Sequence, residues 1–229
     1  MTRDERPLSA VPAWLWSALA LALAVQVLWQ ATGPRGPASG SVAVPAAPSA
    51  AALRLAALGE TAAVARLVPL HLQSFDVARY DAARVIGWLD AALALDPRST
   101  YPLFSAARVY AETPDPASSR AMLEFIHRKF LEDPDRRWPW LAHAALLAKH
   151  RLGDLPLARR YAADLQRRVT ASDVPLWVTQ MEIFILEDMN EVDAAKVLLG
   201  GLLESGRIRD PAEVRFLRER LEALEARTR

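Results

Sequence analysis

The stretch that decides the fold runs from Asp133 to Leu165, DPDRRWPWLAHAALLAKHRLGDLPLARRYAADL. It predicts a helical hairpin: a helix that begins with aromatic residues, a turn at Gly153 and Asp154, and a second helix rich in Ala and Arg. The pattern recurs on both sides of the hairpin at a step of 37 residues. Such a period is typical of stacked helical units that bury their apolar faces against one another. Equivalent positions are Leu103, Trp140 and Trp177; Tyr110, Leu147 and Phe184; Ala121, Ala158 and Ala195.

The predicted fold class is all-α, because no segment has the period-two alternation of a strand. We expect residues 51–229 to form a domain of helical repeats. Its last helix, residues 210–227, has Asp210 as N-cap and Pro211 after it, and it should close the end of the stack. The helices predicted before it include Pro102–Glu112, Trp138–Arg151, Leu155–Val169 and Val192–Glu204, and one that has Asp115 as N-cap and Pro116 at its first position.

The repeats resemble those of the tetratricopeptide family. The segment Ala92–Pro97, ALALDP, is similar to the end of such a repeat, and Trp140, Gly153-Asp154 and Ala158 resemble its leading Trp, its turn and its small second-helix residue. The likeness covers about half of the chain and is divergent, since the family's period is about 34 and Asn190-Glu191 stands where Gly-Asp is expected. Two blocks, residues 124–152 and 180–191, also resemble an uncharacterised family of membrane-anchored proteobacterial proteins, which implies no activity.

The tetratricopeptide resemblance implies a groove that binds peptide segments and is lined by the first helix of each hairpin. It runs from a basic end at Arg108 to an acidic end at Glu182. Trp140 and Trp177 are expected to pack between repeats instead. For the other aromatic residues, packing or plain surface is the competing interpretation. The groove residues implied by register are Tyr101, Phe104, Arg108, Glu112, Trp138, Leu141, Lys149, Val178 and Glu182.

The N-terminal region predicts a membrane anchor. No charged residue lies between Arg6 and Arg35, and the apolar residues 10–30, as a helix, would span about 30 Å, the thickness of a hydrocarbon core. A cleaved signal peptide fits less well, because Trp stands where a small residue is needed before the cleavage site. A buried helix of a soluble domain is the other alternative. Residues 31–50, rich in Gly, Pro, Ser and Ala, predict a flexible linker.

Arg3 and Arg6 precede this span and only Arg35 follows closely, so the positive-inside rule predicts a cytoplasmic tail at residues 1–9. The repeat domain would then lie in the periplasm of a bacterium, anchored by a single pass in the inner membrane.

Composition excludes several classes of function. The chain is 52% hydrophobic and 24% charged, has a net charge of +1 and contains no cysteine. A near-neutral chain gives no basic field for nucleic acid, and the lack of cysteine rules out disulfides and thiolate chemistry. No phosphate-binding loop or hydrolase motif is present. We therefore expect no enzyme activity and no cofactor.

Two charged clusters have a surface interpretation and a functional one. Arg159, Arg160, Arg167 and Arg168 indicate either a solvated, partly self-paired face or a basic patch for an anionic partner. Glu124 and His127 form an E-x-x-H motif without a second copy, so we expect a plain surface and no metal site.

The sequence thus predicts a membrane-anchored scaffold or assembly factor at the bacterial cell envelope that binds other proteins. The alternatives are a subunit of an enzyme complex that acts on envelope polymers, and a structural protein that associates with itself.

Overall fold

The computed structural model describes residues 12–32, 44–75, 80–171, 174–206, 208 and 210–226. Every regular element among these residues is helical, which confirms the predicted all-α class. The chain divides into two compact units, Met1–Gly40 and Ser41–Arg229. The helices are α1 Ala13–Thr32, α2 Ala50–Ala56, α3 Thr61–Leu72, α4 Ala82–Leu95, α5 Tyr101–Ser105, η2 Ala106–Tyr110, α6 Pro116–Glu132, α7 Pro134–His150, α8 Leu155–Arg168, α9 Leu176–Asp188, α10 Val192–Glu204 and α11 Pro211–Ala226.

The described part of the first unit is the helix α1 and the residue before it. This helix has no charged residue, and large apolar side chains such as Trp14, Leu21 and Leu28 are exposed along it. Within the described residues, no helix has both the length and the apolar character needed to cross a bilayer, so the structure does not support the span expected at residues 10–30. The predicted tail, residues 1–9, lies outside the described residues.

The linker expected at residues 31–50 is described only from Val44 onward, and that part packs on the second unit. Val44 is buried, and its carbonyl oxygen accepts a hydrogen bond of 2.8 Å from Arg84 of α4. The carbonyl of Pro45 accepts one of 2.9 Å from the indole N–H of Trp88. These contacts correct the predicted linker boundary, because residues 44–49 belong to the folded unit.

Aspartate side chains cap several helices of the second unit, and Asp115 and Asp210 do so where the sequence predicts a cap. Asp115 accepts hydrogen bonds from the backbone N–H groups of Ala117 and Ser118, and α6 begins at Pro116. Asp210 accepts a 2.9 Å bond from the backbone N–H of Ala212, and α11 begins at Pro211. Each cap satisfies N–H groups that the first helical turn leaves without a partner.

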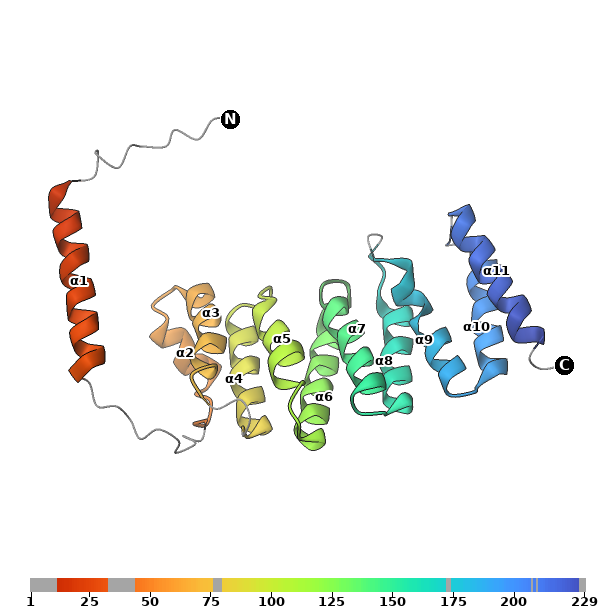
Figure 1. Ribbon diagram of the computed structural model, residues 1–229, viewed down its shortest axis with the longest axis horizontal. Helices are drawn as coiled ribbons and strands as arrows, with labels where there is room; N and C mark the ends of the chain where they lie inside the picture. The colour runs from red at the N-terminus through yellow and green to blue at the C-terminus, as the bar shows by residue number, and fades with distance from the viewer. Residues whose placement is uncertain are drawn as a thin grey trace. The chain divides into compact units, whose positions relative to one another are not determined.

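In the second unit the helices follow one another in chain order along a row (Figure 1). We call α5 with η2, α7 and α9 the first helices of the repeats, and α6, α8 and α10 the second helices. A continuous core of buried residues runs from Val44 to Ile185, and a smaller cluster around Ile183 and Leu199 holds the last three helices together. This arrangement is the stack of helical repeats that the period predicts.

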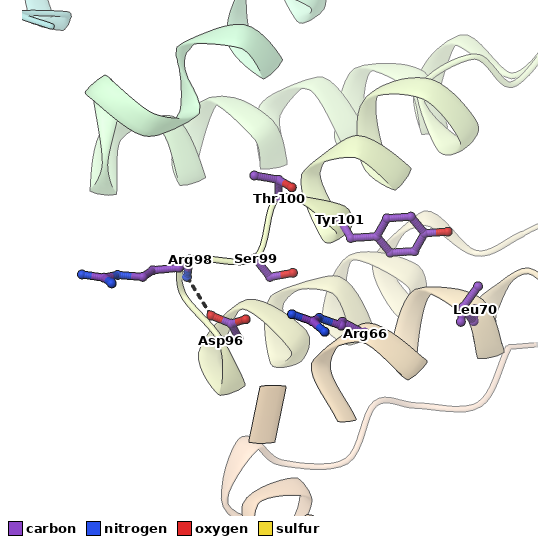
Figure 2. A pocket seen from close by; sticks show the side chains of 7 residues that line it. All are labelled: Arg66, Leu70, Asp96, Arg98, Ser99, Thr100 and Tyr101. Carbon is purple, nitrogen blue, oxygen red and sulfur yellow. Dashed lines mark hydrogen bonds between the residues drawn. The ribbon is translucent and has the colours of Figure 1, made fainter. Parts of the chain in front are cut away.

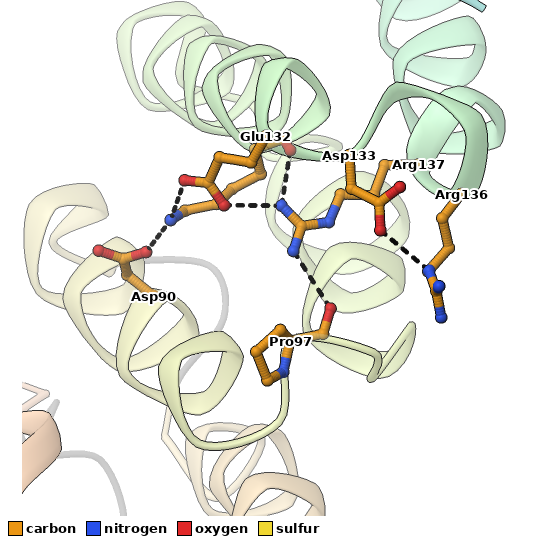
Figure 3. A network of polar contacts seen from close by, with 7 residues as sticks. Asp90, Pro97, Glu132, Asp133, Arg136 and Arg137 are labelled. Atoms are coloured by element: carbon orange, nitrogen blue, oxygen red, sulfur yellow. Dashed lines mark hydrogen bonds and ion pairs between the residues drawn. The ribbon is translucent and has the colours of Figure 1, made fainter. Parts of the chain in front are cut away.

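A polar network joins α4, α6 and α7 (Figure 3). Lys129 Nζ lies 2.5 Å from Asp90 Oδ1 and 2.7 Å from Glu132 Oε1. Arg137, whose exposed fraction is 5%, donates to Lys129 O at 2.6 Å, to Glu132 Oε2 at 2.8 Å and to Pro97 O at 3.2 Å. The buried guanidinium therefore binds acceptors from two repeats and fixes how the repeats meet.

The first of these repeats contains a π-helical turn. The backbone N–H of Ala111 donates to Ala106 O at 2.8 Å, five residues back, and η2 continues α5 directly. The sequence predicts a single helix over Pro102–Glu112, and the structure corrects this to two helical types. π-turns occur often near functional sites, and this one carries Arg108.

Candidate protein-binding face

The first helices share an exposed side, which we call the α5–α7–α9 face. On α7 it is formed by residues at helical spacing, and on α5 and α9 the equivalent residues follow at a step of 38, one more than the step of the core positions; Phe104 is the exception, because it lies 39 residues before His143. The face consists of Tyr101, Phe104, Arg108 and Glu112, then Pro139, His143, Leu146 and His150, then Trp177, Phe184 and Asp188, with the buried Met181 beneath it.

An apolar pocket of about 310 Å³ opens on this face between α7 and α9. Its lining residues are Leu146, Lys149, Trp177, Met181, Phe184 and Ile185. We call it the Trp177 pocket, because that side chain is 47% exposed and packs edge-to-face on Trp138, with ring centroids 6.2 Å apart. Lys149 forms an ion pair with Asp188 at its rim. The apolar lining of the Trp177 pocket can accept a large aliphatic or aromatic side chain.

Aromatic side chains continue the face from α5 to α7. The rings of Tyr101 and Phe104 stack with centroids 5.9 Å apart, and Phe104 meets Trp140 edge-to-face at 5.9 Å. Offset stacks and edge-to-face pairs are the favoured geometries of aromatic rings. The contacts fix the two helices against each other, while Phe104 stays partly exposed and available to a partner.

A polar cluster lies between the aromatic residues and the pocket. The Oε1 atom of Glu112 is 3.7 Å from His143 Nε2 and 3.9 Å from Arg108 Nη1. His143 Nε2 has no hydrogen-bond partner among the described residues. Burial lowers the pKa of His143, and the positive charge of Arg108 lowers it further. Both effects favour the neutral imidazole, and its Nε2 is itself buried beneath the face.

The structure brings together only some of the groove residues implied by register. Tyr101, Phe104, Arg108 and Glu112 lie on the α5–α7–α9 face, Lys149 lies at the pocket rim, and Trp138 is half-buried beside it. Leu141 and Val178 are fully buried and line no groove, which corrects that expectation. Successive residues of a helix are rotated by about 100° around its axis. A shift of one or two positions therefore moves a side chain from the surface into the core.

Two further expectations change. Glu182 is buried on another side of α9, among residues of a different cleft, so Arg108 and Glu182 do not form the two ends of one groove. Trp177 was expected to pack between repeats, but about half of it is exposed. His143, Leu146 and Phe184 were not among the groove residues implied by register. Their spacing of three or four residues on α7 and the 38-residue step were the available signals.

The expected basic patch is neutralised by carboxylates. Arg167 and Arg168 lie 2.9 and 3.4 Å from Asp164 Oδ1, Arg160 is paired with Glu124, and Arg159 Nε lies 3.5 Å from Glu182 Oε1. These four arginines therefore form a partly self-paired face, which was one of the two interpretations of the sequence. No unpaired basic patch remains among them.

The E-x-x-H motif joins two second helices instead of lying free on the surface. His127 Nε2 lies 2.7 Å from Asp164 Oδ2, and both side chains are largely buried between α6 and α8. The expectation of a plain surface is therefore wrong for His127. Among the described residues, no three His, Asp or Glu side chains gather as metal ligands would.

A second cavity, of about 620 Å³, lies between α3 and the loop that precedes α5 (Figure 2). Arg66, Leu70 and Tyr101 contribute to its lining, and Asp96 lies between the guanidinium groups of Arg66 and Arg98 in this view. The carboxylate accepts a 3.0 Å hydrogen bond from the backbone N–H of Arg98. Because Asp96 lines the cavity together with the two arginines, we assign no anionic ligand to it.

The chain matches no protein-family profile, no curated protein and no solved structure. The geometry of the α5–α7–α9 face therefore carries the functional argument.

Proposed function

We propose that this chain is a divergent tetratricopeptide-like scaffold that binds a segment of another protein on its α5–α7–α9 face. The Trp177 pocket is the observation that carries the proposal. A Trp side chain about half exposed beside Leu146 and Phe184 leaves apolar area in water, and covering it with a partner's side chain is favourable at about 25 cal/mol per Å². Trp is also among the residues that most often dominate binding energy at protein interfaces.

The chemistry of the face specifies the bound segment. A large apolar side chain of the partner fills the Trp177 pocket, and the partly exposed ring of Phe104 extends the apolar contact along the face. The ion pair of Lys149 with Asp188 stays at the wet rim, where charges cost little. Apolar centre and polar rim together are the usual anatomy of a protein interface. Binding is passive and requires no reaction.

The envelope location belongs to this proposal as a hypothesis that rests on the sequence. The uncharged stretch between Arg6 and Arg35 favours a single-pass anchor at residues 10–30 in a bacterial inner membrane. A cytoplasmic tail at residues 1–9 and a periplasmic repeat domain follow from the charge distribution. Anchoring would raise the local concentration of the scaffold near membrane partners. Carbonate extraction of membranes and protease protection in spheroplasts test the location, and a protein released by carbonate contradicts it.

Binding is tested by crosslinking in intact cells, followed by affinity purification and mass spectrometry of the full-length chain. The chain offers a matched pair of variants: Leu146 in the pocket is 41% exposed and Leu131 on α6 is 40% exposed. Leu146→Ala and Trp177→Ala should remove a reproducible partner at unchanged folding, whereas Leu131→Ala should retain it. Recovery of the bait alone, recovery only of its own multimer, or equal loss in all three variants would contradict the proposal.

A further inference from the structure

The second helices are joined by ion pairs in the earlier repeats. Between α4 and α6, Lys129 pairs with Asp90 at 2.5 Å. Between α6 and α8, His127 lies 2.7 Å from Asp164, and Arg160 pairs with Glu124. Each of these interfaces is thus closed by at least one contact between side chains of opposite polarity or charge.

The interface between α8 and α10 lacks such contacts. One repeat after Arg160 and Asp164, the chain has Val197 and Gly201, which carry no polar side chain. Among the described residues no hydrogen bond or ion pair joins α8 to α10. Val197 is 74% exposed, and a Cβ added at Gly200 or Gly201 would meet no atom within 4 Å. The stack is therefore open at this position.

Two cavities of about 770 and 360 Å³ occupy the opening, and Glu182 and Leu198 line both. Glu182 is only 8% exposed, and its ion-pair partner is Arg159, whose Nε lies 3.5 Å away. That distance is long for a charge-assisted hydrogen bond, which is usually 2.7–2.9 Å. A largely buried carboxylate gains most from a close cationic partner, and among the described residues Arg159 is the one cation within ion-pair distance of Glu182.

We propose that this cleft binds a Lys or Arg side chain of a partner protein, with its cation paired to Glu182. The methylene stem lies along Val197 and Leu198, as long basic side chains do on apolar surface. The other cations at the cleft do not fill this role: Arg159 is partly exposed and weakly paired, and Arg167 is held by Asp164 at 2.9 Å. One repeat earlier, Arg160 stands at the position of Val197 and pairs with Glu124 of α6, whereas here the incoming cation pairs with Glu182 of α9.

This site is separate from the Trp177 pocket. Glu182 lies five positions after Trp177 on α9, which places the two side chains about 140° apart around the helix axis. The two sites share no lining residue. Loss of binding at one site therefore leaves binding at the other site unchanged.

The test uses the full-length chain, labelled with ¹⁵N, and follows the amide signals of Gly200 and Gly201 during titration. The probe is N-acetyl-arginine amide, and N-acetyl-citrulline amide is its neutral isostere. The arginine probe should shift both signals to saturation, and the citrulline probe should bind about tenfold more weakly or not at all. Glu182→Gln should reduce binding of the arginine probe about tenfold, whereas Glu204→Gln, an exposed glutamate on the same helix as the two glycines, should not.

A second variant keeps the test decisive if Glu182→Gln fails to fold. Val197→Arg places a guanidinium on the cleft wall, so it should abolish the response to the arginine probe while the melting temperature stays the same or rises. Equal binding of the two probes, no saturable shift at either glycine, or an unchanged response in Val197→Arg would each overturn the proposal.

Discussion

Arg137 allows a prediction whose size can be worked out from its contacts. In Arg137→Met, the carbonyl oxygens of Lys129 and Pro97 lose their donor, at 2.6 and 3.2 Å in the native chain. A buried acceptor left without a partner costs about 1–3 kcal/mol. The lost ion pair with Glu132 adds under about 1 kcal/mol, because that carboxylate is about half exposed. Together the two acceptors and the ion pair lead us to expect a fall in the free energy of unfolding of about 2–6 kcal/mol.

Urea unfolding of the full-length chain, followed by far-UV circular dichroism, measures this change. Arg136→Met is the matched control, since Arg136 is partly exposed and pairs only with Asp133 at 2.9 Å. It should cost under about 1 kcal/mol. Arg137→Lys keeps the charge but cannot donate to all three acceptors, so it should fall between the two. If Arg137→Met costs no more than Arg136→Met, the buried network does not hold the repeats together and the reasoning is refuted.

Three further predictions concern stability. Leu141→Ala should lower the free energy of unfolding by about 2–5 kcal/mol, because Leu141 is fully buried; a loss under about 1 kcal/mol would indicate the surface position implied by register. Gly201→Ala should raise it by about 0.5–1 kcal/mol, since the added Cβ meets open space, and a lower melting temperature would contradict this. Burial alone would raise the pKa of Asp164, but hydrogen bonds from Arg167 and His127 outweigh it and lower that pKa. The stabilisation is therefore complete above the unfolded-state pKa of about 4 and lost as the pH falls through the folded-state pKa. Asp164→Asn should reduce the loss of unfolding free energy at acidic pH, and an unchanged loss would refute the assignment.

Helix positions were predictable because their signals are local. Asp115 and Pro116 define the start of α6, and the expected helix Val192–Glu204 agrees with α10 at both ends. A cap depends on hydrogen bonds within one turn, so the neighbouring residues contain all the information needed. The repeat period likewise indicated an all-α stack before any contact was known.

Burial was harder to predict, as one repeat position illustrates. Leu103, Trp140 and Trp177 are equivalent in sequence, yet the first is buried, the second half-buried and the third half-exposed. Trp140 is covered by Phe104 from the preceding repeat, while Trp177 borders an open pocket. Sequence equivalence fixes the angle of a side chain on its own helix, and the covering helix determines how much of it remains in water.

The sequence by itself thus determined most helices and the caps at Asp115 and Asp210, because these follow from interactions between residues less than about two turns apart. It also indicated the repeat architecture, because the 37-residue period can be read directly from the chain. Only the tertiary structure decided that the partner face runs at a step of 38, that Glu182 belongs to a separate cleft, and that α8 and α10 stand apart. Each of these depends on the packing of helices against one another, where a shift of one residue rotates a side chain by about 100°. That rotation is enough to move it between core and surface.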